Sequence, residues 1–389
     1  MQHQKVLRPP HSHHHIPLWE YIYPVGLWIR KNIVLTVAAI AAILTMCIVP
    51  PDAQYASYFD WKTLTCLFCV LAVVCALKNI RFFTILARKI VDSTGNLRTS
   101  VLTLVYITFI GSMLIANDMA LLTFLPLGYF VLSSTGKEKH MAFVFILQNI
   151  AANLGGMLTP FGNPQNLYIY TKFQIPTDEF MWIMLLPFLA AIALITLCCL
   201  FFPKEPLSIK EPCETRLPVK RTLVYLILFV LSIVIVFRII PYQIGLIVIP
   251  AALLWLDRKA LRMVDYPLLL TFVCFFIFSG NLARVPAVND LFSALLEKNT
   301  LLVSALSCQI ISNVPTAILL SQFTGDYPSL LLGVNIGGTG TIIASLASLI
   351  TFREYSKHNP GRIGSYLVKF SALNFSFLIV LLLFCGLLV

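Results

Sequence analysis

The sequence predicts an all-α polytopic membrane protein, built as two inverted repeats with broken helices and about 11–13 hydrophobic passes. Composition, apolar runs and an internal repeat carry this prediction. Of the 389 residues, 58% are hydrophobic and only 12% are charged, with a mean hydropathy of +0.86. Soluble domains carry roughly twice that charged fraction. Most of the surface is therefore expected to face lipid, where the backbone satisfies itself as helix.

The apolar runs and the basic connections define the expected topology. Several runs have the roughly 20 residues that a spanning helix needs, and the others suggest interruptions. Lys and Arg gather in alternate connections, which the positive-inside rule places in the cytoplasm together with the N-terminus. We expect the chain in a plasma membrane, the inner membrane in bacteria. The runs cover about 34–49, 62–77, 99–116, 117–133, 141–158, 180–202, 222–240, 243–256, 266–280, 300–323, 327–350 and 363–388.

Four segments are expected along the chain. Residues 1–30 are expected to form a polar cytoplasmic tail. The tail contains His11, His13, His14 and His15, which we interpret as part of this polar segment and not as a metal site. The net charge of +11 lies largely in this tail and the loops, which does not indicate a nucleic-acid partner. The remaining segments are a first membrane repeat with a preceding helix, a cytoplasmic linker and a second membrane repeat with preceding helices, at 31–202, 203–221 and 222–389.

The most informative feature is a self-similarity between the two halves. Residues 153–159 read N-L-G-G-M-L-T and residues 335–341 read N-I-G-G-T-G-T. Upstream of each lies an Asn-centred interruption, I-A-N-D-M-A-L-L at 115–122 and I-S-N-V-P-T-A-I-L at 311–319. Amphipathic stretches at 81–90 and 286–297 precede these and fall on opposite sides of the membrane by the same pass count. The halves are therefore predicted to be inverted.

Matched interruptions of this kind point to a transporter's binding site. A broken membrane helix strands N–H and C=O groups, which survive only when packed in protein or lining a wet cavity. A single Gly pair is explained well enough by helix packing, but four breaks in matched pairs are not. Free helix N-termini suit an anion, and free C-termini suit a cation. The residues expected to permit the breaks are Gly155, Gly156, Gly337, Gly338, Pro160, Pro164 and Pro315.

Three stretches resemble the ion transporter superfamily, which includes citrate-transporter-like, arsenite permease and Na⁺/H⁺ antiporter families. They are I-A-A-N-L-G-G-M-L-T-P-F-G-N-P-Q-N-L at 150–167, S-N-V-P-T-A at 312–317 and G-V-N-I-G-G-T-G-T-I-I-A-S-L-A-S-L at 333–349. The resemblance implies an elevator-type fold with two re-entrant hairpins, a homodimer, and ions and substrate beside Asn117, Asn153, Ser312, Asn313 and Asn335. Sodium-carboxylate relatives typically carry S-N-T at both breaks. This chain has A-N-D and S-N-V, so the resemblance does not define its ions.

The sequence is compatible with two functions. The first is a secondary transporter that moves a small anion, a carboxylate or an oxyanion, with Na⁺ or H⁺ coupling. The alternative is a Na⁺/H⁺ antiporter in which Asp118 carries the ion or proton, although Asp118 could instead cap a helix starting at Met119. A Na⁺ site is expected at Asn117, Asp118 and Asn313. The full set of candidate substrate and ion ligands is Asn117, Asp118, Asn153, Gly155, Gly156, Thr159, Pro160, Gly162, Asn163, Asn166, Ser312, Asn313, Pro315, Thr316, Asn335, Gly337, Gly338, Thr339 and Thr341.

An enzyme is not expected. The sequence contains no H-E-x-x-H zinc motif, no G-x-S-x-G nucleophile elbow and no phosphate-binding G-x-x-x-x-G-K-[ST] loop. We therefore expect no cofactor beyond the coupling ion.

Overall fold

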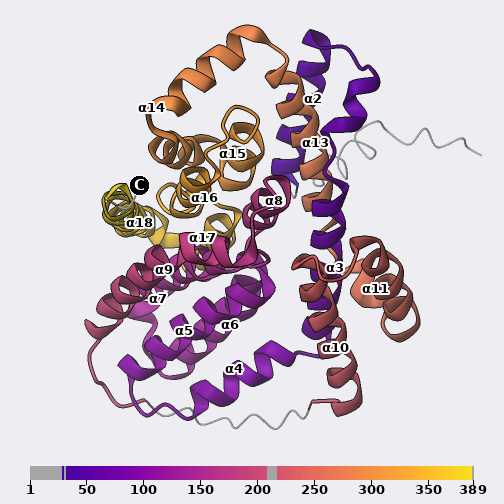
Figure 1. Ribbon diagram of the computed structural model, residues 1–389. Helices are drawn as coiled ribbons and strands as arrows, with labels where there is room; N and C mark the ends of the chain where they lie inside the picture. The colour runs from indigo at the N-terminus through magenta and orange to yellow at the C-terminus, as the bar shows by residue number, and fades with distance from the viewer. Residues whose placement is uncertain (1–28, 30–31, 208–216, 388–389) are drawn as a thin grey trace, which may run out of the picture.

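The computed structural model describes residues 29, 32–207 and 217–387, and these ranges are helical without a β-strand (Figure 1). Within them, eight helices are long and apolar enough to span a bilayer, and three shorter apolar helices accompany them. The predicted all-α multi-span class is confirmed. The predicted tail, with its four histidines, and the middle of the predicted linker lie outside the described residues.

The first half contains one interrupted pair of helices and one short helix between two long ones. α5 and α6 follow each other across a single residue and pack together, which makes a re-entrant hairpin. Asp60 and Asn96 cap the starts of α3 and α5 by accepting the N–H of Thr63 and Thr99 at 2.9 and 3.0 Å. The helices are α2 (Ile33–Ile48), α3 (Trp61–Asn79), α4 (Phe82–Asp92), α5 (Leu97–Ile115), α6 (Asn117–Ser134), α7 (Met141–Gly155), α8 (Pro164–Lys172) and α9 (Thr177–Leu200).

The second half repeats this order. α14 is interrupted at Asn299, whose φ of −167° is not helical. The part before Asn299 is the amphipathic stretch expected at 286–297, and the part after it forms a second hairpin with α15. The helices are α10 (Val219–Val236), α11 (Tyr242–Leu256), α12 (Arg258–Arg262), α13 (Tyr266–Ala283), α14 (Pro286–Ile311), α15 (Asn313–Leu320), α16 (Tyr327–Ile336), α17 (Leu346–His358) and α18 (Ile363–Gly386).

The two halves are inverted relative to each other. Helix α4 and the first part of α14 occupy equivalent places in the repeat, yet Figure 1 shows them at opposite ends of the molecule. α7, α8 and α9 correspond to α16, α17 and α18 in the same way. The amphipathic arms thus lead into two hairpins that enter from opposite sides.

The helices form two groups, which we call the flanking bundle and the broken-helix bundle. In the flanking bundle, α2 packs along α13, and α10 and α11 pack on α3 (Figure 1). The broken-helix bundle contains both hairpins and α7–α9 with α16–α18. The two bundles meet where α3 contacts α8 and α13 contacts α15.

Exposure separates the lipid-facing helices from those that carry the breaks. Large apolar side chains point outward on α9, α11 and α18, among them Trp182, Trp255 and Leu383, which are 71%, 87% and 68% exposed. In contrast, α7 and α16 are buried almost throughout. This agrees with the rule that interrupted backbone at membrane depth must be covered by protein.

Close packing of α7 on α5 gives a direct test of the fold. A Cβ at Gly155 would lie 2.2 Å from the backbone oxygen of Phe109 and 2.5 Å from Oγ of Ser112. We expect Gly155→Ala to cost roughly 1–3 kcal/mol through overpacking and to lower the apparent melting temperature of the purified protein. Gly364→Ala is the matched control, because a Cβ there meets nothing within 4 Å. Equal melting temperatures for the two variants would contradict this packing.

Candidate substrate and ion site

The tips of the two hairpins have the same unusual backbone. Ala116 has φ 65° and ψ 152°, and Ser312 has φ 73° and ψ 159°. This region is close to one that only Gly normally occupies, and it costs roughly 1–3 kcal/mol for other residues. At each tip the next residue, Asn117 or Asn313, accepts the N–H of its successor at 2.9 Å with Oδ1. Strain conserved between two halves of one chain suggests a functional requirement for this geometry.

The first Gly-Gly break has its stranded carbonyls satisfied by one amide. Asn166 Nδ2, from the first turns of α8, lies 3.1, 3.1 and 3.2 Å from the carbonyl oxygens of Gly156, Met157 and Thr159. A side chain at Gly156 or Gly162 would collide with this turn, since each Cβ would lie within 2.4 Å of a polar atom across it. The break is therefore a tightly packed loop and not a frayed helix end.

The backbone groups of the second Gly-Gly break are likewise hydrogen-bonded by one side chain, here from the second hairpin. Gln309 Nε2 donates to the carbonyls of Gly337 and Thr339 at 2.9 and 3.0 Å, and its Oε1 accepts the N–H of Thr341 at 2.8 Å. Gly340 next to it has φ +115°, which favours Gly. One side chain thus pairs three backbone groups of the loop.

Equivalent contacts in the two halves show that the repeat is structural as well as sequential. Thr159 Oγ1 donates to the carbonyl of Met113 at 3.0 Å, and Thr341 Oγ1 donates to the carbonyl of Gln309 at 3.0 Å. Met113 and Gln309 each lie four residues before the tip Asn of their hairpin. Each hairpin is therefore fastened to the break of its own half by the same hydrogen bond.

The two halves then meet through their breaks. Asn153 Oδ1 accepts from Ser345 Oγ at 2.8 Å, and Asn335 Oδ1 accepts from Asn163 Nδ2 at 3.4 Å. Ser345 lies ten residues after Asn335, as Asn163 lies ten residues after Asn153. These two contacts occupy equivalent positions in the two repeats, so the approximate two-fold axis that relates the repeats passes between them.

Both hairpin tips reach this junction. Asn117 Nδ2 donates to Asn153 Oδ1 at 3.2 Å. A Cβ on Gly338 would lie 3.2 Å from Asn313 Nδ2 and 3.7 Å from Asn153 Oδ1. The structure therefore brings together all four breaks that the sequence singled out. Their role as ligands stays a prediction.

The remaining candidates lie around the junction with their polar groups already used. Ser312 Oγ donates to the carbonyl of Ala344 at 3.3 Å. Thr316 and Thr339 donate to the backbone carbonyls of Ser312 and Ile336 at 2.7 and 2.6 Å. Pro160 and Pro315 are buried, and Pro315 is inside α15, which begins at Asn313. These residues shape the breaks, and in this conformation they present few free donors.

Charge is sparse at the junction. Within the described residues, no Lys or Arg donates a hydrogen bond to the amides and hydroxyls of this network. Four helices, α6, α8, α15 and α17, begin at the breaks, and four, α5, α7, α14 and α16, end there. Their partial charges bring positive and negative potential to one place.

Asp118 is the carboxylate beside this junction, and the capping hypothesis for it is wrong. α6 begins at Asn117, so Asp118 lies inside the first turn. Its N–H is taken by Asn117 Oδ1. Its own Oδ1 is buried with no hydrogen-bond partner in the part of the chain that the structure describes. An acidic group in the first turn still gains from the helix dipole.

Several residues of the network were not singled out from the sequence. Gln165 Nε2 reaches Asn335 Oδ1 at 3.4 Å, and Asn149 Nδ2 reaches Ser348 and Asn374 at 3.3 and 3.4 Å. Gln309 was also not singled out, although it forms hydrogen bonds with three backbone groups of the second break. The usable signal was a lone amide in an otherwise apolar run, since such a group must find a partner when buried.

Gln309 provides the test of this site's architecture. Gln309→Leu would leave three buried backbone groups of the second break unpaired, at roughly 1–3 kcal/mol each. We expect a markedly lower apparent melting temperature and little or no transport. Gln243→Leu is the control, because Gln243 is exposed on α11. If Gln309→Leu melted as the control does, the second break would not depend on this side chain.

Comparison with known proteins identifies the family of this chain. A profile of the citrate transporter family matches residues 25–325. The chain is 33% identical over 324 residues to the uncharacterized transporter MJ0456 of Methanocaldococcus jannaschii, which covers 83% of this chain and 88% of that protein. It is 30% identical over 302 residues to the inner membrane protein YbiR of Escherichia coli K12, with 76% and 80% covered. The chain belongs to the citrate transporter family.

Proposed function

We propose that this protein is a secondary active transporter that moves a small carboxylate anion across the membrane, coupled to Na⁺ or H⁺. The observation that carries the proposal is the convergence of four helix breaks, two from each inverted half, on one buried network of amides and hydroxyls. Interrupted helices at the interface between repeats are where secondary transporters bind substrate and ions. Membership in a family of transporters supports the general class.

The chemistry of the junction favours an anion held without a salt bridge. Four helix N-termini supply positive potential there, and Asn, Ser and Thr side chains supply donors. Among the described residues, no Lys or Arg is hydrogen-bonded to the junction network. An anion bound there would form no salt bridge and would be released readily. A carboxylate is favoured over other anions by the family match, whose description is a citrate transporter.

The same junction has the acceptors that a small cation needs. Helix C-termini and amide carbonyls provide oxygen ligands, and Asp118 is the nearby carboxylate with a free oxygen among the described residues. We propose that Na⁺ or a proton binds at Asn117, Asp118 and Asn313, and that its charge offsets that of the substrate. Asn117 and Asn313 are uncharged, so among these three residues Asp118 decides the charge of the site.

Alternating access would follow from the two bundles. Both hairpins and both Gly-Gly breaks belong to the broken-helix bundle, which contacts the flanking bundle along α3 and α13. We propose an elevator movement of the first bundle against the second, with the N-terminus in the cytoplasm and the chain in a plasma membrane. In a homodimer that forms through the flanking bundle, the flanking bundles would stay in place while the broken-helix bundles move.

The alternative is a Na⁺/H⁺ antiporter in which Asp118 carries both ions in turn. The unpartnered, buried Oδ1 of Asp118 is the specific observation that favours it. In this case the substrate of the junction would be the cation alone. The two proposals differ in whether Asp118 supports the movement of an anion.

The proposal is tested by uptake of radiolabelled citrate into proteoliposomes containing the purified protein. We expect uptake under an imposed Na⁺ or H⁺ gradient and little uptake without one. The Asn153→Ala variant, which would leave Asn117 and Ser345 without their common acceptor, should lose most of it. Asn289→Ala serves as control, since Asn289 is exposed on the arm of α14. Absence of uptake for citrate and for other di- and tricarboxylates would contradict the proposal.

The Asp118→Asn variant separates the two proposals. Under the antiporter proposal, it abolishes the Na⁺-driven change in fluorescence of a pH dye inside the vesicles. Under the anion-transport proposal, wild-type protein shows no such signal without a carboxylate present. Asp290→Asn, at an exposed position of α14, is the matched control.

A further inference from the structure

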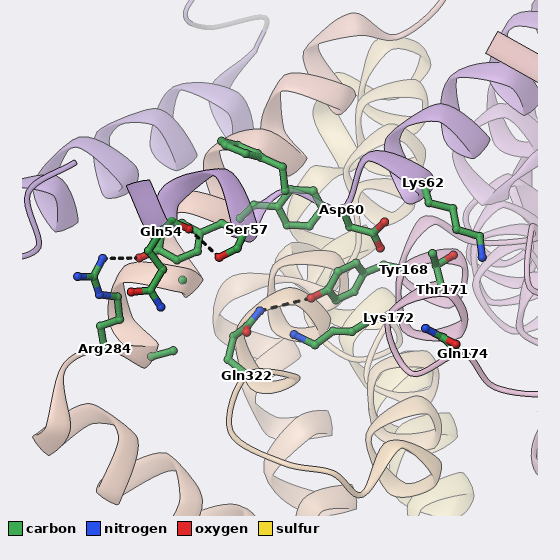
Figure 2. Close-up of a pocket in the computed structure, with 15 residues that line it drawn as sticks. Gln54, Ser57, Asp60, Lys62, Tyr168, Thr171, Lys172, Gln174, Arg284 and Gln322 are labelled. Carbon is green, nitrogen blue, oxygen red and sulfur yellow. Dashed lines mark hydrogen bonds between the residues drawn. The ribbon is translucent and has the colours of Figure 1, made fainter. Parts of the chain in front are cut away.

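A second polar feature lies away from the breaks, in a cavity of about 570 Å³ between the two bundles. Figure 2 shows it lined on one side by residues of the flanking bundle and on the other by residues of the broken-helix bundle. Asp60, Lys62 and Arg284 come from the first, and Lys172 and Gln322 from the second. Its volume is in the range of ligand sites for small molecules.

The lining has more cations than it can pair. Arg284 is already used, because its guanidinium contacts both carboxylate oxygens of Asp52 at 3.1 and 2.7 Å. Asp60 caps α3 through Thr63, whose N–H and hydroxyl it accepts at 2.9 and 2.6 Å. Lys62 and Lys172 remain, and neither has a carboxylate within 4.0 Å among the described residues.

Lys172 is held in place although it is not paired. It is the last residue of α8, where the helix dipole favours a cation. Its Nζ lies 5.9 Å from the centre of the Tyr168 ring, and the Tyr168 hydroxyl in turn contacts Ser321 at 2.9 Å. The charge of Asp60 acts on both Lys62 and Lys172, so one carboxylate faces two half-buried lysines. A ligand that supplies negative charge would therefore be stabilised here.

The position of the cavity connects it to the breaks. α8 starts directly after Asn163 and ends at Lys172, so nine residues, or about 13 Å of helix, separate the two. The cavity lies beside the connection at 50–61, which has no Lys or Arg and which the positive-inside rule therefore places outside. An anion arriving from outside would meet Lys62 and Lys172 before the break network.

We propose that this cavity is an outer capture site for a small polycarboxylate, with one carboxylate on Lys62 and another on Lys172. It rests on the proposed function for the identity of the anion. Gln322 and Tyr168, joined at 3.5 Å, make the same wall polar. The break network has no basic side chain, so the lysines of the cavity add full positive charges to the partial charges that the helix N-termini supply at the network.

Binding can be measured without transport. Purified protein is acetylated briefly with an amine-selective reagent, and each lysine is quantified by mass spectrometry with and without citrate. We expect citrate to slow modification of Lys62 and Lys172 severalfold and to leave Lys298 unchanged. Lys298 is the control because it is exposed, outside the cavity and on the arm that the inverted topology places on the same side.

Sulfate and chloride at matched ionic strength distinguish a polycarboxylate site from general charge screening. Equal modification of all three lysines with and without citrate would overturn the proposal. Protection by sulfate or chloride as strong as that by citrate would overturn it as well. If wild-type protein took up no carboxylate but citrate still protected both lysines, the transport proposal would fail and the capture site would stand.

Kinetics give the second measurement. Lys172→Gln should raise the KM for citrate uptake roughly tenfold, the lower end of electrostatic steering effects, and leave the maximal rate unchanged. Lys172→Arg retains the charge and should keep KM near the wild-type value, which also checks that the position tolerates substitution. Lys298→Gln should behave as wild type. An unchanged KM in Lys172→Gln would overturn the role of this lysine.

Discussion

Unpaired backbone groups inside the membrane are the constraint on which this structure depends. A helix that stops in hydrocarbon leaves N–H and C=O groups that cost several kcal/mol each unless another group pairs them. Here Asn166 pairs carbonyls of the first Gly-Gly break, and Gln309 pairs two carbonyls and one N–H of the second. With these amides in place, four helix breaks can face one another at the centre of the protein, which is what makes a site there feasible.

Both halves of the chain hold their breaks in place with equivalent hydrogen bonds. Thr159 and Thr341 fasten each break to its own hairpin, while Asn153 and Asn335 join the break of one half to that of the other. The hairpin tips add strain at Ala116 and Ser312. Tips that are strained and fastened by only a few hydrogen bonds are suited to rearrange when a ligand binds.

The sequence predicted the helices well where apolar runs were long, and it predicted the four breaks because they recur as a motif. It did not mark α8, whose polar sequence P-Q-N-L-Y-I-Y-T-K has no apolar run although its residues are almost all buried. It also left open that Asp118 caps a helix starting at Met119, whereas α6 begins at Asn117, one residue before Asp118. Gln309 and Ser345 act across loops or between halves, so no local pattern could reveal their partners.

Substrate is proposed to bind where the breaks of the two halves meet. Cryo-electron microscopy of the protein in lipid nanodiscs with citrate tests it most directly. We expect interrupted helices at 115–117 and 311–313, and citrate density bounded by Asn117, Asn153, Asn313 and Gly338. Continuous helices through either hairpin tip, or citrate density found only away from this junction, would contradict it.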